Sequence, residues 1–182
     1  MEIAILKHVD FEGPAEIENW CRQTGNEYKV YRLFLGEALP KAERTDFLVI
    51  LGGPMSVLDE LPWLEEERQL IRVLISQGKP VFGVCLGGQQ IAKALGADIF
   101  QGEYREAGWL PIRTMKSETL GELPEELVVF HWHGEQFGLP EGAERLFTSE
   151  VCPNQGFIYK ENVIGLQFHF ESTKESIESI LQ

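Results

Sequence analysis

The sequence predicts an α/β fold: an open, mostly parallel, twisted sheet with helices on both faces and antiparallel additions. Short and almost wholly apolar runs, such as residues 47–51 and 81–84, are typical of strands covered on both faces. Segments with apolar residues at helical spacing alternate with these runs, and the second half of the chain is richer in strand-like runs. We expect a single domain over residues 1–182, because a chain of this length fits one hydrophobic core.

Strands and helices alternate in the first half. We expect strands at 3–7, 28–34, 47–51 and 81–84, and helices at 14–25, 62–78 and 86–95. Pro14 and Pro62 suit the first turn of their helices, and Gly25, Gly78 and Gly96 suit helix ends. Cys85 therefore falls at the turn between a strand and a helix.

The second half predicts mostly antiparallel strands, at 108–115, 127–132, 145–148 and 157–168, the last broken by a turn at 160–162. Ser172 and Glu175 have the Ser-x-x-Glu spacing of a capping box, which predicts a final helix. Ligands bind parallel sheets beyond the carboxyl ends of the strands. We expect segments 52–54, 83–87 and 169–171 to converge there.

Charge and cysteine content exclude several classes of partner. A formal net charge of −13 opposes binding to a phosphate backbone, so we expect no nucleic-acid partner. The N-terminal apolar run is too short for a signal-peptide core or a membrane span, so we expect no membrane partner. Cys21, Cys85 and Cys152 show no Cys-x-x-Cys spacing, which fits a reducing cytoplasm better than a disulfide framework.

Residues 83–87, Gly-Val-Cys-Leu-Gly, have the Gly-x-nucleophile-x-Gly form of a nucleophile elbow. The positive end of the following helix favours the thiolate form of Cys85. The backbone N–H of Leu86 and one near Gly53 are the expected donors of an oxyanion hole. Alone, a cysteine after an apolar strand is more often a small buried hydrophobe.

His169 is the expected proton carrier, because it follows an apolar run and precedes Glu171 by two residues. The carboxylate can orient the imidazole, which gives Cys85, His169 and Glu171 the roles of nucleophile, acid and base, and orienting group. A lone histidine is more often structural. The glycines on each side of Cys85, the Gly-Gly-Pro turn and the His-x-Glu pair together favour catalysis instead.

The alternating residues His131, His133 and Glu135 allow a second interpretation, a metal site of two histidines and one carboxylate. Gly134 within this run suits a loop that holds a substrate at least as well. We expect neither a metal nor another cofactor.

Segments 52–54, 83–89 and 167–171, Gly-Gly-Pro, Gly-Val-Cys-Leu-Gly-Gly-Gln and Gln-Phe-His-Phe-Glu, resemble the class I (triad-type) glutamine amidotransferases over nearly the whole chain. Residues 131–135 further resemble free-standing proteins related to the amidotransferase domain of GMP synthase. The resemblance implies a flavodoxin-like three-layer fold. It also implies that Cys85 attacks the glutamine side-chain amide, forms a γ-glutamyl thioester and releases ammonia and glutamate.

By the same resemblance, Gly53, Leu86 and Gln89 line the glutamine pocket. Trp132, Gly134 and Glu135 match the loop that holds the substrate's α-amino and α-carboxylate groups. The chain departs from the family at Phe170, where many members have proline between the histidine and the glutamate. It also ends soon after the predicted capping box, and the sequence leaves open whether a longer C-terminal segment is missing.

The sequence contains no P-loop of the Gly-x-x-x-x-Gly-Lys-Ser/Thr form, so we expect any ammonia-accepting synthetase to be a separate protein. Two alternatives stay open. The same three residues would serve a γ-glutamyl hydrolase or peptidase, and an amidotransferase fold can also act as a non-catalytic binding protein.

Overall fold

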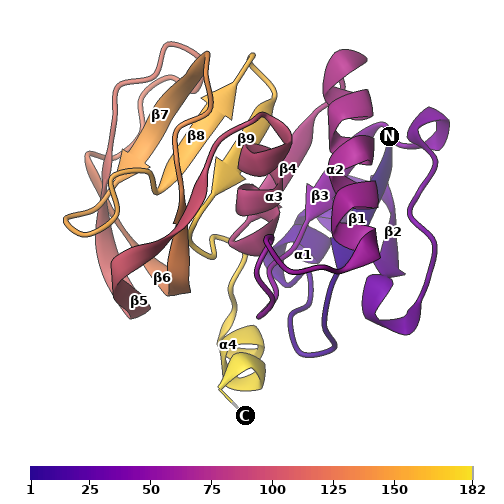
Figure 1. The fold of residues 1–182 in the computed structure, drawn as a ribbon, viewed down its shortest axis with the longest axis horizontal. Helices are drawn as coiled ribbons and strands as arrows, with labels where there is room; N and C mark the ends of the chain where they lie inside the picture. The colour runs from indigo at the N-terminus through magenta and orange to yellow at the C-terminus, as the bar shows by residue number, and fades with distance from the viewer. Residues whose placement is uncertain (182) are drawn as a thin grey trace.

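The computed structural model describes residues 1–181, in which nine strands form one sheet in the order β2-β1-β3-β4-β9-β8-β7-β5-β6 (Figure 1). The strands are β1 (Glu2–Lys7), β2 (Glu27–Arg32), β3 (Phe47–Ile50), β4 (Val81–Val84), β5 (Ile99–Thr114), β6 (Glu126–Phe137), β7 (Ala143–Thr148), β8 (Gly156–Tyr159) and β9 (Val163–Leu166). The helices are α1 (Glu16–Gln23), α2 (Pro62–Ser76), α3 (Leu86–Ala94) and α4 (Lys174–Ile180), with short 3-10 turns η1 (Leu33–Leu35) and η2 (Ala42–Arg44).

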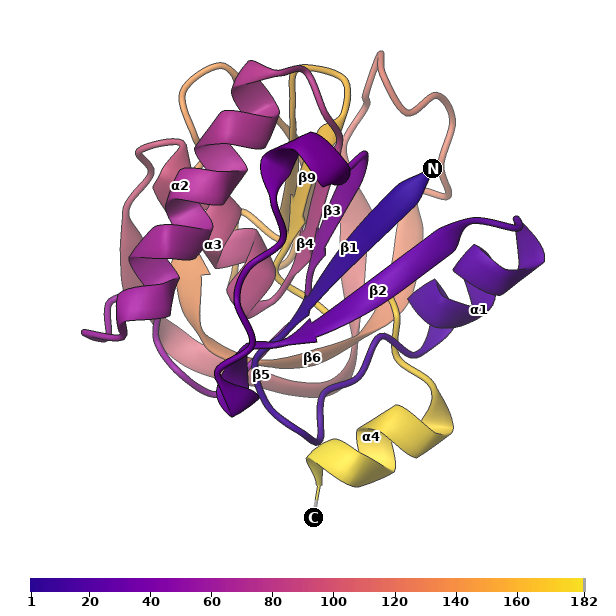
Figure 2. The same cartoon turned by 90° about the vertical axis from the view of Figure 1, so that its right-hand side faces the viewer.

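Five strands, β2, β1, β3, β4 and β9, pair in parallel and have helices on both faces. Alternate side chains of β1 enter different cores: Leu6 packs with α2 and α3, whereas Ile5 packs on the face that Cys21 of α1 covers. Figure 2 shows α2 and α3 on one side of these strands and α1 on the other. Within the part of the chain that the structure describes, no helix combines the length and apolarity needed to cross a bilayer.

The other four strands, β8, β7, β5 and β6, extend the sheet in antiparallel pairing beyond β9. β5 and β6 are longer than the predicted strands at 108–115 and 127–132, since β5 already begins at Ile99 and β6 runs on to Phe137. The pairing of β5 with β6 shifts register between Gln101 and Glu106. The polar run over this irregular part hides its strand character, because its exposed residues follow no alternating apolar pattern.

The final helix begins one residue later than predicted. Thr173, not Ser172, is its N-cap: the Thr173 hydroxyl accepts a hydrogen bond from the Ser176 N–H at 3.2 Å, and the Ser176 hydroxyl accepts one from the Thr173 N–H at 2.8 Å. The predicted pair Ser172 and Glu175 is therefore wrong. Serine at the third helical position serves in place of glutamate, and its shorter side chain reaches the cap equally well.

The carboxyl ends of β1, β3, β4 and β9 lie side by side, because these strands are parallel neighbours. The residues that follow them are therefore brought to one edge of the sheet, as predicted for such folds. His8 follows β1, Gly52 and Gly53 follow β3, and Cys85 follows β4.

Candidate active site

Cys85 lies on a sharp turn between β4 and α3, with φ 50° and ψ −111°. A non-glycine residue adopts positive φ only at an energetic cost, and such strain is typical of functional turns. The turn also needs glycine on each side: a Cβ at Gly87 would lie 2.1 Å from the Ile50 carbonyl oxygen, and one at Gly83 would lie 2.4 Å from the Gly87 carbonyl carbon. The local sequence thus makes a nucleophile elbow possible.

His169 and Glu171 form a buried pair, in which His169 Nδ1 lies 2.8 Å from Glu171 Oε1. The backbone fixes both residues, since the His169 N–H donates to the Phe130 carbonyl at 2.8 Å and the Glu16 N–H donates to the Glu171 carbonyl at 3.0 Å. Phe170 between them is 64% exposed. Phenylalanine in place of the family's proline therefore leaves the approach of the carboxylate to the imidazole intact.

Cys85, His169 and several predicted substrate-binding residues line one cavity of about 530 Å³. Burial alone would lower the pKa of His169, but the charge of Glu171 and the hydrogen bonds of the ring to Cys85 and Glu171 outweigh it. The pKa of His169 is thereby raised well above its usual value of 6.5. This shift favours the protonated form of the imidazole beside the sulfur.

The two expected oxyanion donors border the same cavity. Gly53 faces it, and a Cβ at Gly53 would lie 3.0 Å from Leu86 Cδ2, so the two residues are in contact. Among residues 1–181, the backbone N–H groups of Gly53 and Leu86 have no hydrogen-bond partner. Both donors are therefore available to a negatively charged oxygen that forms beside Cys85.

The predicted substrate-holding residues Trp132, Gly134 and Glu135 also line this cavity, but they lie within strand β6 and not in a loop. Gln89 lies within the cavity and donates to the Glu135 carbonyl at 3.2 Å and to Gln167 Oε1 at 3.3 Å. The Glu135 carboxylate accepts a hydrogen bond from the Ser56 hydroxyl at 2.8 Å, and the Cys85 Sγ lies 3.9 Å from the Trp132 carbonyl oxygen. Gly134 lines the cavity too, so Gln89, Trp132, Gly134 and Glu135 all border the cavity that Cys85 lines.

Three charged residues of the cavity, Glu12, Arg105 and Glu106, were not singled out from the sequence. Glu12 and His169 both pack against Gly52, because a Cβ added at Gly52 would meet Glu12 Oε2 and His169 Cε1. Burial raises the pKa of Glu12 and the charge of Glu171 adds to this, against the opposing effect of His169. Arg105 is the one arginine or lysine that lines the cavity within the described part of the chain.

The alternative metal set needs a correction, because its carboxylate is Glu106 and not Glu135. Glu106 of β5 is paired in register with His133 of β6, and its Oε2 lies 3.1 Å from His133 Nε2 and 4.0 Å from His131 Nδ1. Glu135 points instead to Ser56. Sequence spacing could not identify the partner, since it comes from another strand.

Hydrogen bonds already engage both oxygens of this carboxylate. Gln155 donates to Glu106 Oε2 at 2.7 Å, and the Ser149 hydroxyl donates to Oε1 at 2.9 Å. Burial lowers the pKa of His131 to about 4 and the charge of His133 adds to this, against the opposing effect of Glu106. The donor atoms are close enough for a cation, but the hydrogen bonds and the Glu106–His133 pair also account for the cluster as a buried link between β5, β6 and the segment that carries Ser149 and Gln155.

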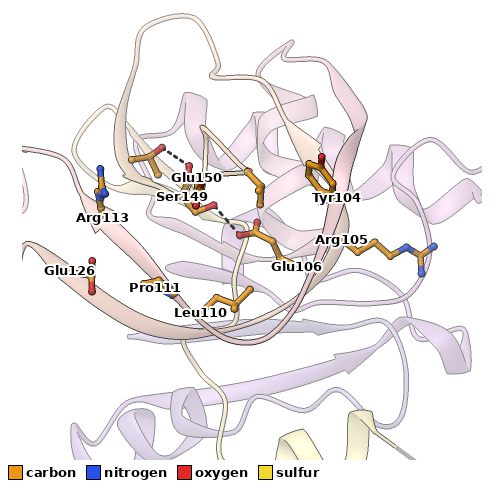
Figure 3. Close-up of a pocket in the computed structure, with 11 residues that line it drawn as sticks. Tyr104, Arg105, Glu106, Leu110, Pro111, Arg113, Glu126, Ser149 and Glu150 are labelled. Carbon is orange, nitrogen blue, oxygen red and sulfur yellow. Dashed lines mark hydrogen bonds between the residues drawn. The ribbon is translucent and has the colours of Figure 1, made fainter.

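A second cavity of about 740 Å³ lies beside the first and shares Arg105 and Glu106 with it. Figure 3 shows Glu106 bonded to Ser149 in this second cavity, while the Arg105 side chain extends away from the other lining residues. Arg113 of the same strand lines only the second cavity. Glu106 thus stands between the two spaces.

The chain belongs to the class I glutamine amidotransferase family, whose profile matches residues 13–181. It is 34% identical to the glutamine amidotransferase-like protein YfeJ of Salmonella typhimurium over the whole chain and 80% of that protein. It is 35% identical to the glutamine-hydrolysing GMP synthase of Bacillus cytotoxicus over 72% of the chain, which spans 25% of that enzyme.

Solved structures agree with this assignment. A glutamine amidotransferase from Thermotoga maritima superposes with a TM-score of 0.93 at 34% identity, covering the whole chain and 80% of that protein. One from Methylobacillus flagellatus gives a TM-score of 0.94 at 32% identity, covering 98% of the chain and 74% of that protein. The predicted fold class is therefore confirmed.

Proposed function

We propose that this protein hydrolyses the side-chain amide of glutamine and supplies the ammonia to an acceptor on a separate synthetase. The observation that carries the proposal is that Cys85, on a strained turn, and His169 line one cavity, while Glu171 is paired with His169. Membership of the glutamine amidotransferase family supports glutamine as the amide donor.

In the first half of the reaction, the Cys85 thiolate adds to the carbonyl carbon of the side-chain amide. The N–H groups of Gly53 and Leu86 stabilise the oxygen that becomes negative. His169 then donates its proton to the nitrogen, the carbon–nitrogen bond breaks, and ammonia leaves. A γ-glutamyl thioester on Cys85 remains.

In the second half, His169 takes a proton from a water molecule, which adds to the thioester carbonyl. The carbon–sulfur bond breaks, glutamate leaves, and the thiolate of Cys85 is restored with His169 protonated. Glu171 stabilises the imidazolium and fixes which ring nitrogen faces the sulfur, because it occupies Nδ1. The sum is glutamine and water converted to glutamate and ammonia.

The charges around the cavity suit the free amino-acid end of the substrate. Arg105 is positioned to bind the α-carboxylate, since it is the cation among the described lining residues. Glu135 supplies a carboxylate for the α-amino group, and Gln89 holds the Glu135 carbonyl in place. Trp132 and Gly134 complete the wall of this end of the pocket.

A second candidate is a γ-glutamyl hydrolase or peptidase that uses the same thioester chemistry. The size of the cavity favours it, because about 530 Å³ falls in the range of sites for ligands larger than one amino acid. The cavity also extends to Phe11 and Ile180, where the far part of a γ-glutamyl conjugate would lie.

Ammonia release from glutamine and cleavage of a γ-glutamyl peptide, measured on the same preparation, separate the two candidates. We expect faster turnover of glutamine by the wild type, and none by Cys85→Ala. Preferred cleavage of the peptide would replace the first candidate by the second. Equal rates in the wild type and in Cys85→Ala would remove Cys85 from the mechanism.

A further inference from the structure

A second buried histidine–glutamate pair, His8 and Glu67, lies directly beneath the Gly52–Gly53 segment. His8 follows β1 and Glu67 lies on α2, and both side chains are fully buried. His8 Nδ1 lies 3.0 Å from the Gly52 carbonyl oxygen, and His8 Nε2 lies 2.9 Å from Glu67 Oε2. Both ring nitrogens are therefore occupied, unlike those of a histidine that exchanges protons with a substrate.

The Gly52 carbonyl and the Gly53 N–H belong to the same peptide unit. That unit is planar and trans, so its C=O and N–H point in opposite directions. A donor that holds the carbonyl on the α2 side thereby aims the N–H to the other side. Gly53 lines the cavity of Cys85, so that other side is the site of reaction.

The pair is itself firmly held. Gln90 donates to Glu67 Oε1 at 3.0 Å, Arg68 donates to Gln90 Oε1 at 2.8 Å, and Trp63 stacks on the His8 ring with centroids 5.2 Å apart. Burial alone would lower the pKa of His8, but the charge and hydrogen bond of Glu67 outweigh it and raise the pKa above 6.5. The Gly52 carbonyl and the Glu67 carboxylate both accept hydrogen bonds, so both ring nitrogens are placed to donate, and the raised pKa favours that form.

We propose that His8, braced by Glu67, is a positioning residue that holds the Gly53 N–H as an oxyanion donor. The proposal rests on the proposed function, because it assigns His8 a role in the same amide hydrolysis. Two successive glycines have few steric limits on rotation. Without the bond from His8, this peptide is free to turn and take its N–H away from the developing negative charge.

Two amide substitutions at position 8 test the proposal, since each retains one of the two hydrogen bonds. The nitrogen of His8→Asn matches Nδ1 and keeps the bond to the Gly52 carbonyl, whereas that of His8→Gln matches Nε2 and keeps the bond to Glu67. We expect His8→Gln to lower kcat about 100-fold with little change in KM, as for loss of one oxyanion donor. His8→Asn is expected to retain most of kcat.

A role confined to stability predicts a different result, because both variants lose one buried hydrogen bond and the positive charge. Equal losses of kcat in the two variants, or full activity in His8→Gln, would overturn the proposal. Crystal structures of both variants show the orientation of the Gly52–Gly53 peptide directly. The Gly52 carbonyl should keep its direction in His8→Asn and turn in His8→Gln. An unturned peptide in His8→Gln would contradict the proposal even if the wild type proved unable to hydrolyse glutamine.

The wild type provides a test that needs no variant. In a crystal structure of Cys85 modified by a glutamine-like chloroketone, the Gly52 carbonyl should remain on His8 while the Gly53 N–H faces the inhibitor oxygen. A carbonyl that leaves His8 in this adduct would exclude the positioning role. An inactive wild type that forms no adduct would instead count against the proposed function.

Discussion

The parallel and antiparallel halves of the sheet contribute different things to the cavity. The parallel half supplies the groups that we propose for bond breaking, Cys85 after β4, Gly53 after β3 and His169 after β9. The antiparallel half supplies Arg105 from β5 and Glu135 from β6, which suit the amino-acid end of a substrate. In the proposed mechanism, the reacting groups therefore follow short buried strands, and the substrate-binding groups lie on the long, partly exposed strands β5 and β6. Changes in the parallel half should lower kcat, and changes in the antiparallel half should raise KM.

The largest effect is expected from His169→Asn. Loss of the proton carrier should lower kcat at least about 1,000-fold with little change in KM, as typical of general acid–base residues. The matched control is His133→Asn in the antiparallel half, where kcat should stay within about tenfold of the wild type. Steady-state glutaminase assays check both. A comparable loss of kcat in the two variants would break the division between the halves.

Gly87→Ala should have the next largest effect, on stability. The new methyl group would lie 2.1 Å from the Ile50 carbonyl oxygen, so strand β3 and the elbow must move apart. We expect the free energy of unfolding to fall by about 1–3 kcal/mol, the usual cost of overpacking a core. Gly13→Ala is the control, because nothing lies within 4 Å of its added Cβ. Urea denaturation should distinguish them, and equal midpoints would argue against a tightly packed elbow.

Arg105→Ala sharpens the role of the antiparallel half. Loss of the partner of the substrate's α-carboxylate should raise KM for glutamine about tenfold, which corresponds to 1.4 kcal/mol, with kcat unchanged. Arg113→Ala removes the same charge from the same strand, but Arg113 lines only the second cavity. Its KM should match the wild type. A fall in kcat with an unchanged KM in Arg105→Ala would instead show that strand β5 contributes to the chemical step, against the proposed division between the two halves.

The smallest effect is a pH shift in Glu12→Gln. His169 must carry a proton to release ammonia, and its pKa is raised, so activity should fall as the pH rises through that pKa. Ionised Glu12 favours the imidazolium, since the charges of Glu12 and His169 interact. Its removal should shift the alkaline limb of kcat to lower pH by less than about one unit. The exposed control Glu43→Gln should leave the limb in place; a shift to higher pH in Glu12→Gln would contradict the account.

Local pattern predicted the parallel half well. The apolar runs and glycine stops gave strands β3 and β4 and helix α2 nearly to their observed bounds, and the motif around Cys85 fell at the predicted turn. These signals work because strand, turn and helix chemistry depend on neighbours in sequence.

Contacts across the fold could not be predicted in the same way. Glu106 meets His133 only through the register of β5 and β6, which a bulge interrupts. His8, which follows β1, meets Glu67 of α2 although 59 positions separate them in the sequence. Neither pair has a spacing that marks it in the sequence, so the carboxylate beside the histidines was assigned to Glu135, a residue on the same strand.

A covalent intermediate on Cys85 tests the central claim most directly. Protein mixed with glutamine, quenched in acid within one turnover and digested, can be analysed by mass spectrometry. The account predicts a mass increase of one glutamyl group on the peptide that contains Cys85, and its absence in Cys85→Ala. Ammonia release from the wild type without any such adduct, or an adduct on Cys21 or Cys152 instead, would contradict it.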